Sequence, residues 1–366
     1  STVYAAGLSL RGDGGFDGDP AALPKPEPNS TYAVVPTLRN WASDGSVRTD
    51  LFDNLLISPD LQLTQITVIE ELAVAHLWPG VDIDYRGLDP NLADAYTQFI
   101  KDLADRLHAQ GKTLSVRVEP PQQIAADRWD TGGYDWRTLT QYADFLLIPA
   151  PVDPKAWAAG GQAEALLAWA VGEAERSKVQ FVLPGRSVEQ AGRYLLTKSY
   201  SEALAPLVGE IALAQTTAAP GQQVQAQLRR ERQPSALVLD DTIGMQTYQY
   251  IDMQGHQRTM WLENAASLSR KLSVVGRYNL GGVVLQTLLA KDSDPEIWQV
   301  TRAFQAGEVT ARPSQLALAW RVTSPTAGEL ANEQRSLAET QFAVPVPNRP
   351  GETVNIEAEK IGTAHV

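Results

Sequence analysis

The chain has 366 residues, which is enough for one large barrel and a small second domain. Its 43 acidic and 31 basic residues give a net charge of −12 and a pI near 4.9, which argues against a nucleic-acid partner and against binding to anionic membranes. There is no cysteine, the four histidines show no metal-ligand spacing, and no apolar run is long enough to span a bilayer. We therefore expect no disulfide, no metal, no cofactor and no membrane-spanning segment.

The order of predicted elements indicates a parallel sheet. Short apolar runs bounded by turn residues predict strands, and apolar residues at helical spacing predict the helices between them. The predicted strands cover 3–10, 32–37, 80–85, 113–119, 145–148, 179–185 and 281–287. One predicted helix starts at Asn91 or Asp94 and ends near His108. The others cover 55–77, 139–142, 163–177, 262–278 and 296–304. This alternation predicts an α/β fold, a (β/α) barrel.

Two segments do not fit a simple strand and helix repeat. The stretch from 187 to 279 is too long for one loop and one helix, and its 245–261 part predicts a hairpin that turns on Gln254 and Gly255. Beyond a linker near Arg312, the segment 314–366 predicts a short all-β region. It is about half the length of an immunoglobulin or fibronectin-like sandwich. We expect either a truncated module of that kind or a strand meander.

The predicted strand at 80–85 carries acids to its carboxyl end. Val81, Ile83 and Tyr85 alternate with Asp82 and Asp84, so the two acids share one face. In a closed parallel barrel, acids on the inner face at that end lie at the mouth, where active sites form.

This segment resembles the signature D-G-x-D-x-D-x-E of glycoside hydrolase family 18, which includes chitinases and spore-lysin-type N-acetylglucosaminidases. Gly80, Asp82 and Asp84 match the signature. Pro79 replaces the first Asp, and Arg86 stands where the family has its catalytic Glu.

The resemblance implies a (β/α)8 TIM-type barrel over 1–308 with a small α+β insertion, about 190–262, before the last strand. The strand at 281–286 resembles the family's final strand, and 5–16 resembles its second strand and turn. By this comparison the first barrel strand is missing from the chain. An open sheet edge invites aggregation, so we expect a partner to supply or cover that strand.

The resemblance also implies that the hydrolytic chemistry is lost. Family 18 enzymes use the substrate's acetamido oxygen as the nucleophile and a Glu as the acid, whereas an Arg keeps its proton near neutral pH. The family's Tyr and Asp after the sixth strand are replaced by the segment 148–151, and its stacking Trp by Gln286. We expect no catalytic residue, and we treat Asp82, Asp84 and Arg86 as the remnant of the motif.

Glu119 ends the neighbouring strand and is the alternative acid, paired with Asp84 as in ordinary glycosidases. We favour a simpler interpretation, in which Glu119 neutralises Arg86 across adjacent strands. Asp82 and Asp84 are likewise expected to serve the fold more than catalysis. Trp261 in the insertion hairpin is the best candidate for a sugar platform, because aromatic faces stack on sugar rings.

The sequence thus predicts an inactive barrel that binds a glycan containing N-acetylglucosamine, of chitin or peptidoglycan type, or that serves as a structural piece of a bacterial envelope assembly. The alternative is an active glycosidase that uses Asp84 and Glu119 in unusual roles. The expected ligand-binding residues are Asp84, Tyr85, Glu119, Trp261 and Gln286. The resemblance alone places the protein outside the cell or on its surface.

Overall fold

The structure is a computed structural model that describes residues 1–42, 44–208, 210–213, 224–229, 234–289, 292–308, 321–323, 341–345 and 353–357. Two compact units account for these residues. The first takes its described residues from 1–185, 269–288 and 307–311, and the second from 186–268, 289–306 and 312–366. None of the helices in these ranges is both long and apolar enough to cross a membrane.

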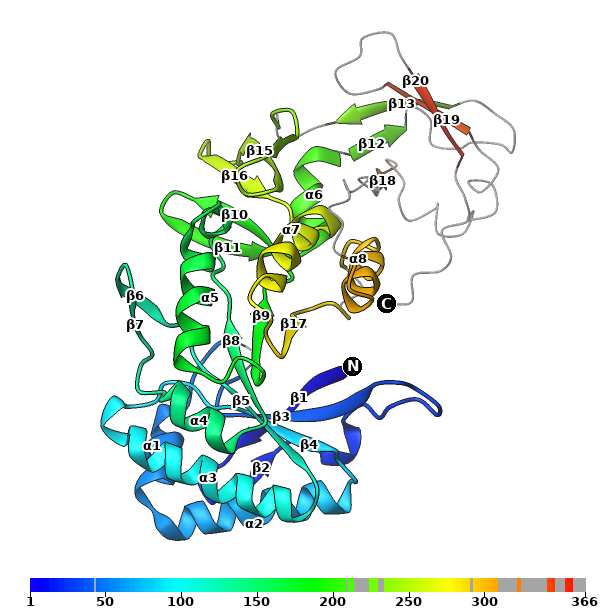
Figure 1. The fold of residues 1–366 in the computed structure, drawn as a ribbon. Helices are drawn as coiled ribbons and strands as arrows, with labels where there is room; N and C mark the ends of the chain where they lie inside the picture. Colours follow the sequence, from blue (N-terminus) through cyan, green and yellow to red (C-terminus); the bar gives the residue numbers. More distant parts are fainter. Residues whose placement is uncertain are drawn as a thin grey trace. The chain divides into compact units, whose positions relative to one another are not determined.

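The first unit is built on a parallel sheet, in the order β17-β9-β8-β5-β4-β3-β1, with the short β2 antiparallel at the far edge of β1 (Figure 1). These strands are β1 (Thr2–Leu10), β2 (Phe16–Asp17), β3 (Ala33–Arg39), β4 (Gly80–Asp84), β5 (Thr113–Arg117), β8 (Phe145–Pro149), β9 (Val179–Leu183) and β17 (Gly282–Leu285). Each parallel strand expected from the sequence is present, and the predicted α/β class is confirmed.

A hydrogen bond across the inner face shows that this sheet is curled. The hydroxyl of Tyr4 on β1 donates to Oε1 of Gln180 on β9, at 3.1 Å. The two strands are five positions apart in the sheet order. In a flat sheet that separation is roughly 24 Å, at about 4.8 Å per strand, which is too far for these two side chains to meet. The sheet is therefore curled into part of a barrel, with polar side chains facing its interior.

Helices cover the outer face of the curled sheet. They are α1 (Thr49–Ile57), α2 (Pro59–Ala75), α3 (Ala93–Ala109), α4 (Trp136–Tyr142) and α5 (Gln162–Glu173), and a small hairpin, β6 (Gln122–Ala125) with β7 (Arg128–Asp130), follows β5. The helix predicted at 55–77 is divided between α1 and α2. Pro59 disfavours a helical conformation at Ser58, whose hydroxyl instead accepts from the Leu61 amide and caps α2.

The predicted start of the next helix was also wrong in detail. Neither Asn91 nor Asp94 caps α3. Asp89 instead accepts from the Asn91 amide at the start of a short 3-10 turn, Pro90–Leu92, which leads directly into the helix. The predicted stop is confirmed, because Gly111 follows the helix with a φ of +66°, a conformation that glycine adopts without strain.

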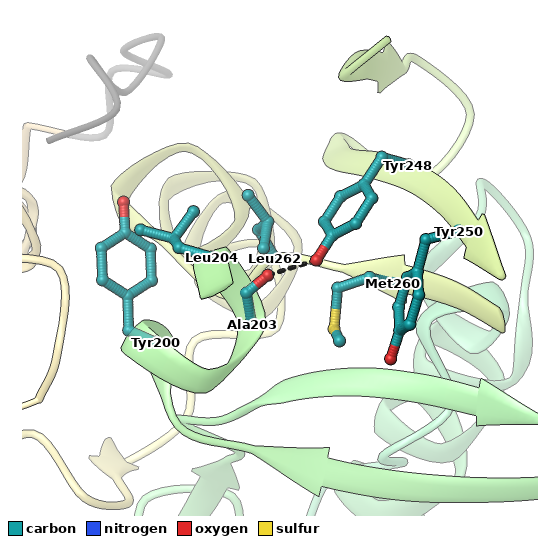
Figure 2. Close-up of a cluster of buried hydrophobic side chains, with 7 residues drawn as sticks. All are labelled: Tyr200, Ala203, Leu204, Tyr248, Tyr250, Met260 and Leu262. Atoms are coloured by element: carbon teal, nitrogen blue, oxygen red, sulfur yellow. Dashed lines mark hydrogen bonds between the residues drawn. The ribbon is translucent and has the colours of Figure 1, made fainter. Parts of the chain in front are cut away.

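The second unit contains an antiparallel sheet in the order β11-β10-β16-β15-β14, where β10 is Ser187–Ala191, β11 is Tyr194–Lys198, β14 is Val238–Asp240, β15 is Met245–Ile251 and β16 is Gln257–Trp261. The predicted hairpin is confirmed by the pairing of β15 with β16. Helix α6 (Tyr200–Val208) packs on this sheet through a buried apolar cluster, shown in Figure 2, in which the Tyr248 hydroxyl donates to the carbonyl of Ala203.

A further sheet of the second unit joins the insertion to the C-terminal region. Its order is β18-β12-β13-β19-β20, with β12 at Glu210–Leu213, β13 at Val224–Arg229, β18 at Arg321–Thr323, β19 at Gln341–Pro345 and β20 at Thr353–Glu357. In the segment 314–366, for which the sequence predicts an all-β region, the residues that the structure describes are the strands β18, β19 and β20. The remaining helices are α7 (Ala265–Gly276) and α8 (Ile297–Gln305).

Gly80 is required where β4 begins beside β5. A Cβ at this position would lie 2.6 Å from the carbonyl oxygen of Thr113, which is fixed by the sheet. We expect Gly80→Ala to lower the free energy of unfolding by about 1–3 kcal/mol, because the added methyl group overpacks this site. Urea denaturation measures this loss. Gly172→Ala is the matched control, because nothing lies within 4 Å of that Cβ. Equal stability of the two variants would contradict this account.

Candidate functional site

Asp82 is buried inside the curled sheet and is held by two neighbouring strands. Its Oδ2 accepts from Thr37 Oγ1 on β3 at 2.7 Å and from Arg117 Nε on β5 at 2.6 Å. The side chain of Asp82 is fully buried, and the side chain of Arg117 is 16 % exposed. Burial raises the pKa of the Asp82 carboxyl, while Arg117 and Thr37 act in the opposite direction. This acid ties β3, β4 and β5 together.

Tyr4 extends the same interior network. Its hydroxyl lies 3.4 Å from Ser115 Oγ in addition to its bond with Gln180, and its ring lies 5.0 Å from the Arg117 guanidinium. The polar interior is therefore continuous from β3 to β9.

Asp84 is engaged by Arg86, two residues further along the chain. Arg86 Nε donates to Oδ1 at 3.0 Å and Nη2 donates to Oδ2 at 2.9 Å, a bidentate pair. The Asp84 side chain is 9 % exposed and that of Arg86 is 38 % exposed. Both carboxylate oxygens of Asp84 thus have the same cationic partner, and that partner is accessible to solvent.

The backbone of Arg86 is fixed to the end of β3. Its amide donates to Asn40 Oδ1 at 2.8 Å, and Asn40 Nδ2 donates back to the Arg86 carbonyl at 2.9 Å. Asn40 is buried. The Arg86 guanidinium also lies 3.9 Å from the centre of the Trp41 ring, a cation–π contact. Arg86 is therefore a well-positioned residue.

Glu119 does not neutralise Arg86, and that expectation was wrong. Its Oε2 accepts from the Gly87 amide at 2.7 Å and lies 3.2 Å from the Tyr134 hydroxyl. Gly87 has a φ of +73°, so the chain turns there and presents its amide to the carboxylate. Asp84 already neutralises Arg86, and the Arg86 side chain is partly exposed to solvent, so Arg86 does not require Glu119 as a partner.

Tyr85, expected among the ligand-binding residues, is a core residue in this structure. It has no exposed surface and lies on the face of β4 opposite to Asp84. Its ring centre is 5.3 Å from that of Phe52 and 6.4 Å from that of Phe99. The alternation along the strand that brings the acids inward therefore sends this tyrosine toward the helices.

The other two expected ligand-binding residues lie elsewhere. Gln286 follows β17, where it is exposed and its amide donates to the Leu183 carbonyl. Trp261 belongs to the second unit, in β16, and is 5 % exposed, so its ring has little free surface for a sugar. Of the expected residues, the structure brings together Asp84 and Glu119, around the turn at Arg86 and Gly87.

An open pocket of about 380 Å³ lies where β1 ends, lined by Leu10, Arg11, Gly12, Asp13, Asp17, Arg48 and Leu51. Its two arginines are paired locally, Arg11 with Asp13 and Arg48 with Asp50. These exposed pairs leave no unneutralised arginine in this pocket. Among the described residues, no group of acids and histidines could hold a metal ion.

Sequence reasoning missed the roles of Arg117 and Thr37. For Arg117 a signal was present, because Ser115 and Arg117 alternate with the apolar residues of β5, as the acids do in β4. For the contact between Trp41 and Arg86 there was none, since the two residues lie in loops that follow different strands.

No family model matches the chain. Its curated relatives include an uncharacterised glycosylase, YvbX, of Bacillus subtilis strain 168, which is 20 % identical over 296 residues, covering 76 % of this chain and 78 % of the relative. The cortical fragment-lytic enzyme of the same organism is 21 % identical over 222 residues, which is 59 % of this chain and 47 % of that enzyme.

The fold is that of solved chitinases. The chitinase from Chromobacterium violaceum superposes with a TM-score of 0.62 and 22 % identity, over 83 % of this chain and 91 % of that one. The spore cortex-lytic enzyme SleL of Bacillus cereus gives a TM-score of 0.60 and 18 % identity, over 81 % and 66 % of the two chains. The expected chitinase-like α/β architecture is therefore supported.

The pair of Asp82 with Arg117 should dominate the stability of the first unit. Arg117→Met leaves a buried carboxylate without its cation, so we expect a loss of about 3–5 kcal/mol at pH 7. The folded-state pKa of Asp82, already raised by burial, should rise further in this variant. The protonated form then favours folding, so the loss should shrink as the pH falls toward about 4. Urea denaturation at several pH values measures this.

Arg106→Met is the control, because Arg106 is paired with Glu70 on the surface and is 49 % exposed. Its effect should be at most about 1 kcal/mol. Adding Asp82→Asn to Arg117→Met should recover part of the lost stability. A loss in Arg117→Met that is equal at pH 4 and pH 7 would contradict the assignment.

Proposed function

We propose that this protein is a glycan-binding member of the chitinase-like barrels that does not hydrolyse its ligand. The observation that carries the proposal is the bidentate pair between Asp84 and Arg86 at the carboxyl end of β4. Its ligand class is a glycan that contains N-acetylglucosamine, of the chitin or peptidoglycan type. The names of the relatives, a glycosylase and a cortical fragment-lytic enzyme, support that class.

The chemistry of Arg86 supports the loss of hydrolysis. Cleavage of a glycosidic bond needs a group that gives a proton to the leaving oxygen. A guanidinium keeps its proton far above neutral pH, so Arg86 cannot serve as this acid. The same cation disfavours the positive charge that develops on the sugar ring in the transition state.

The alternative is a glycosidase that uses Asp84 and Glu119. It requires Asp84 to be released from Arg86, and Glu119 to be released from the Gly87 amide and the Tyr134 hydroxyl. Removing a partner from a partly buried charged group is costly. The binding function needs neither change, and we prefer it for this reason.

A structural role in a bacterial envelope assembly is the second part of the proposal. In the described part of the chain, β17 pairs only with β9, and the outer edge of β1 pairs only with β2, at residues 9–10. A partner segment that paired with both edges in parallel orientation would close the barrel. This role places the protein outside the cell or on its surface.

Calorimetric titration of the protein with a chitin tetrasaccharide, followed by mass analysis of the sugar, tests the proposal. We expect saturable heat and an intact tetrasaccharide. Arg86→Ala should weaken binding by about tenfold, the effect of losing one charge-assisted hydrogen bond.

If the wild-type protein cleaves the tetrasaccharide to shorter sugars and Glu119→Gln does not, the protein is a glycosidase instead. Glu173→Gln is the matched control, since Glu173 is exposed at the end of α5 and paired with Arg137. If the titration gives no heat and the sugar is not cleaved, glycan binding fails for this ligand and the structural role is what remains of the proposal.

A further inference from the structure

The strand register places one more arginine beside Asp84. Thr37 on β3 is opposite Asp82 on β4, and two residues further Arg39 is opposite Asp84. On its other side, Arg39 is opposite Ser9 on β1. Because side chains alternate along a strand, Thr37 and Arg39 share one face, and Thr37 contacts the inward-facing Asp82. Arg39 therefore lies on the inner face at the mouth, level with Asp84.

Arg39 has no acidic partner in the part of the chain that the structure describes. Its natural neighbour, Asp84, has both oxygens occupied by Arg86. Arg39 Nε instead donates to the Ser9 hydroxyl at 3.3 Å. A guanidinium has five N–H donors, and the bond to Ser9 engages one of them. A partly buried arginine left in this state favours an anion from outside.

Three arginines and three carboxylates lie at the mouth or just inside it. Arg117 pairs with Asp82 and Arg86 pairs with Asp84, while Glu119 accepts from the Gly87 amide and the Tyr134 hydroxyl rather than from an arginine. The protein as a whole has a net charge of −12. Among the described residues of the mouth, Arg39 is therefore a cation without a carboxylate partner, in a protein whose overall charge is negative.

Trp41 fixes the two outer guanidiniums. Its ring centre lies 3.9 Å from Cζ of Arg86 and 4.7 Å from Cζ of Arg39. The two cations therefore lie against one aromatic side chain and are held in position before any ligand arrives. Preorganised planar guanidiniums match the geometry of a carboxylate, which accepts two parallel hydrogen bonds.

We propose that Arg39 and Arg86, held by Trp41, form a subsite for the carboxylate of an acidic sugar residue. This inference rests on the proposed glycan-binding function and specifies its ligand. A chain of neutral N-acetylglucosamine offers no negative charge to this subsite. A glycan in which alternate sugars carry a carboxylate, as an ether-linked acid or a uronic acid, does so.

Two tetrasaccharides distinguish these ligands. One is the neutral chitin tetrasaccharide, and the other is the peptide-free peptidoglycan tetrasaccharide, in which alternate sugars carry a free lactyl carboxylate. In calorimetric titrations at about 50 mM salt, we expect the acidic sugar to bind at least about tenfold more tightly. This preference should decrease at about 500 mM salt, because screening weakens an exposed ionic contact.

Arg39→Gln should remove most of the preference for the acidic sugar, and Arg39→Lys should retain part of it. Arg48→Gln is the control, because it removes the same charge from a residue that is paired with Asp50. This variant should prefer the acidic sugar as strongly as the wild-type protein does. If Arg48→Gln lowers the preference as much as Arg39→Gln does, the preference comes from the overall charge of the protein and the assignment of the subsite is wrong.

The outcomes separate this inference from the function on which it rests. If both sugars bind equally to the wild-type protein, glycan binding stands and the carboxylate subsite is wrong. If neither sugar binds, the proposed function fails for these ligands and the subsite fails with it. Binding of the acidic sugar alone, lost in Arg39→Gln, supports both.

Discussion

The ion pair between Asp82 and Arg117 lies where three strands of the curled sheet meet, and the arrangement of the mouth depends on it. Curling turns one face of the sheet inward, so polar side chains on that face cannot reach bulk water and must find partners among themselves. Asp82 takes one from β3 and one from β5. With its carboxylate committed to this pair, the acid two residues later is the one that reaches the mouth.

The turn after β4 shows how Arg86 is supported. Arg86 is held at its backbone by Asn40, at its head group by Asp84 and at its flat face by Trp41. The next residue, Gly87, is held by Glu119. This degree of support is what a functional side chain requires. A surface arginine with no role would not need contacts from its own strand and from the two residues that follow β3.

Periodicity in the sequence was sufficient for the parallel strands of the first unit and for the direction of each side chain on β4. It predicted the parallel strands and the inward acids, because alternation is a property of the strand itself. It could not predict partners, since these depend on how far the sheet curls and on which carboxylate lies nearer. Glu119 was therefore assigned to Arg86, although it contacts the Gly87 amide. Tyr85 was proposed as a ligand-binding residue, although the alternation along the strand places it in the core. Trp261 shows the same limit, because an aromatic residue in a hairpin carries no sign of its burial.

The two proposals for the mouth follow from one electrostatic change. A carboxylic acid at position 86 would supply a proton and, once ionised, would stabilise a cationic sugar ring. An arginine there does the reverse on both counts, and it also removes Asp84 from the surface that a neutral sugar would meet. The proposed loss of hydrolysis and the proposed affinity for an anion would then have the same electrostatic cause. Arg39 takes part in this event because the acid opposite it is already paired with Arg86, so its lack of a carboxylate partner is a consequence of the pair between Arg86 and Asp84.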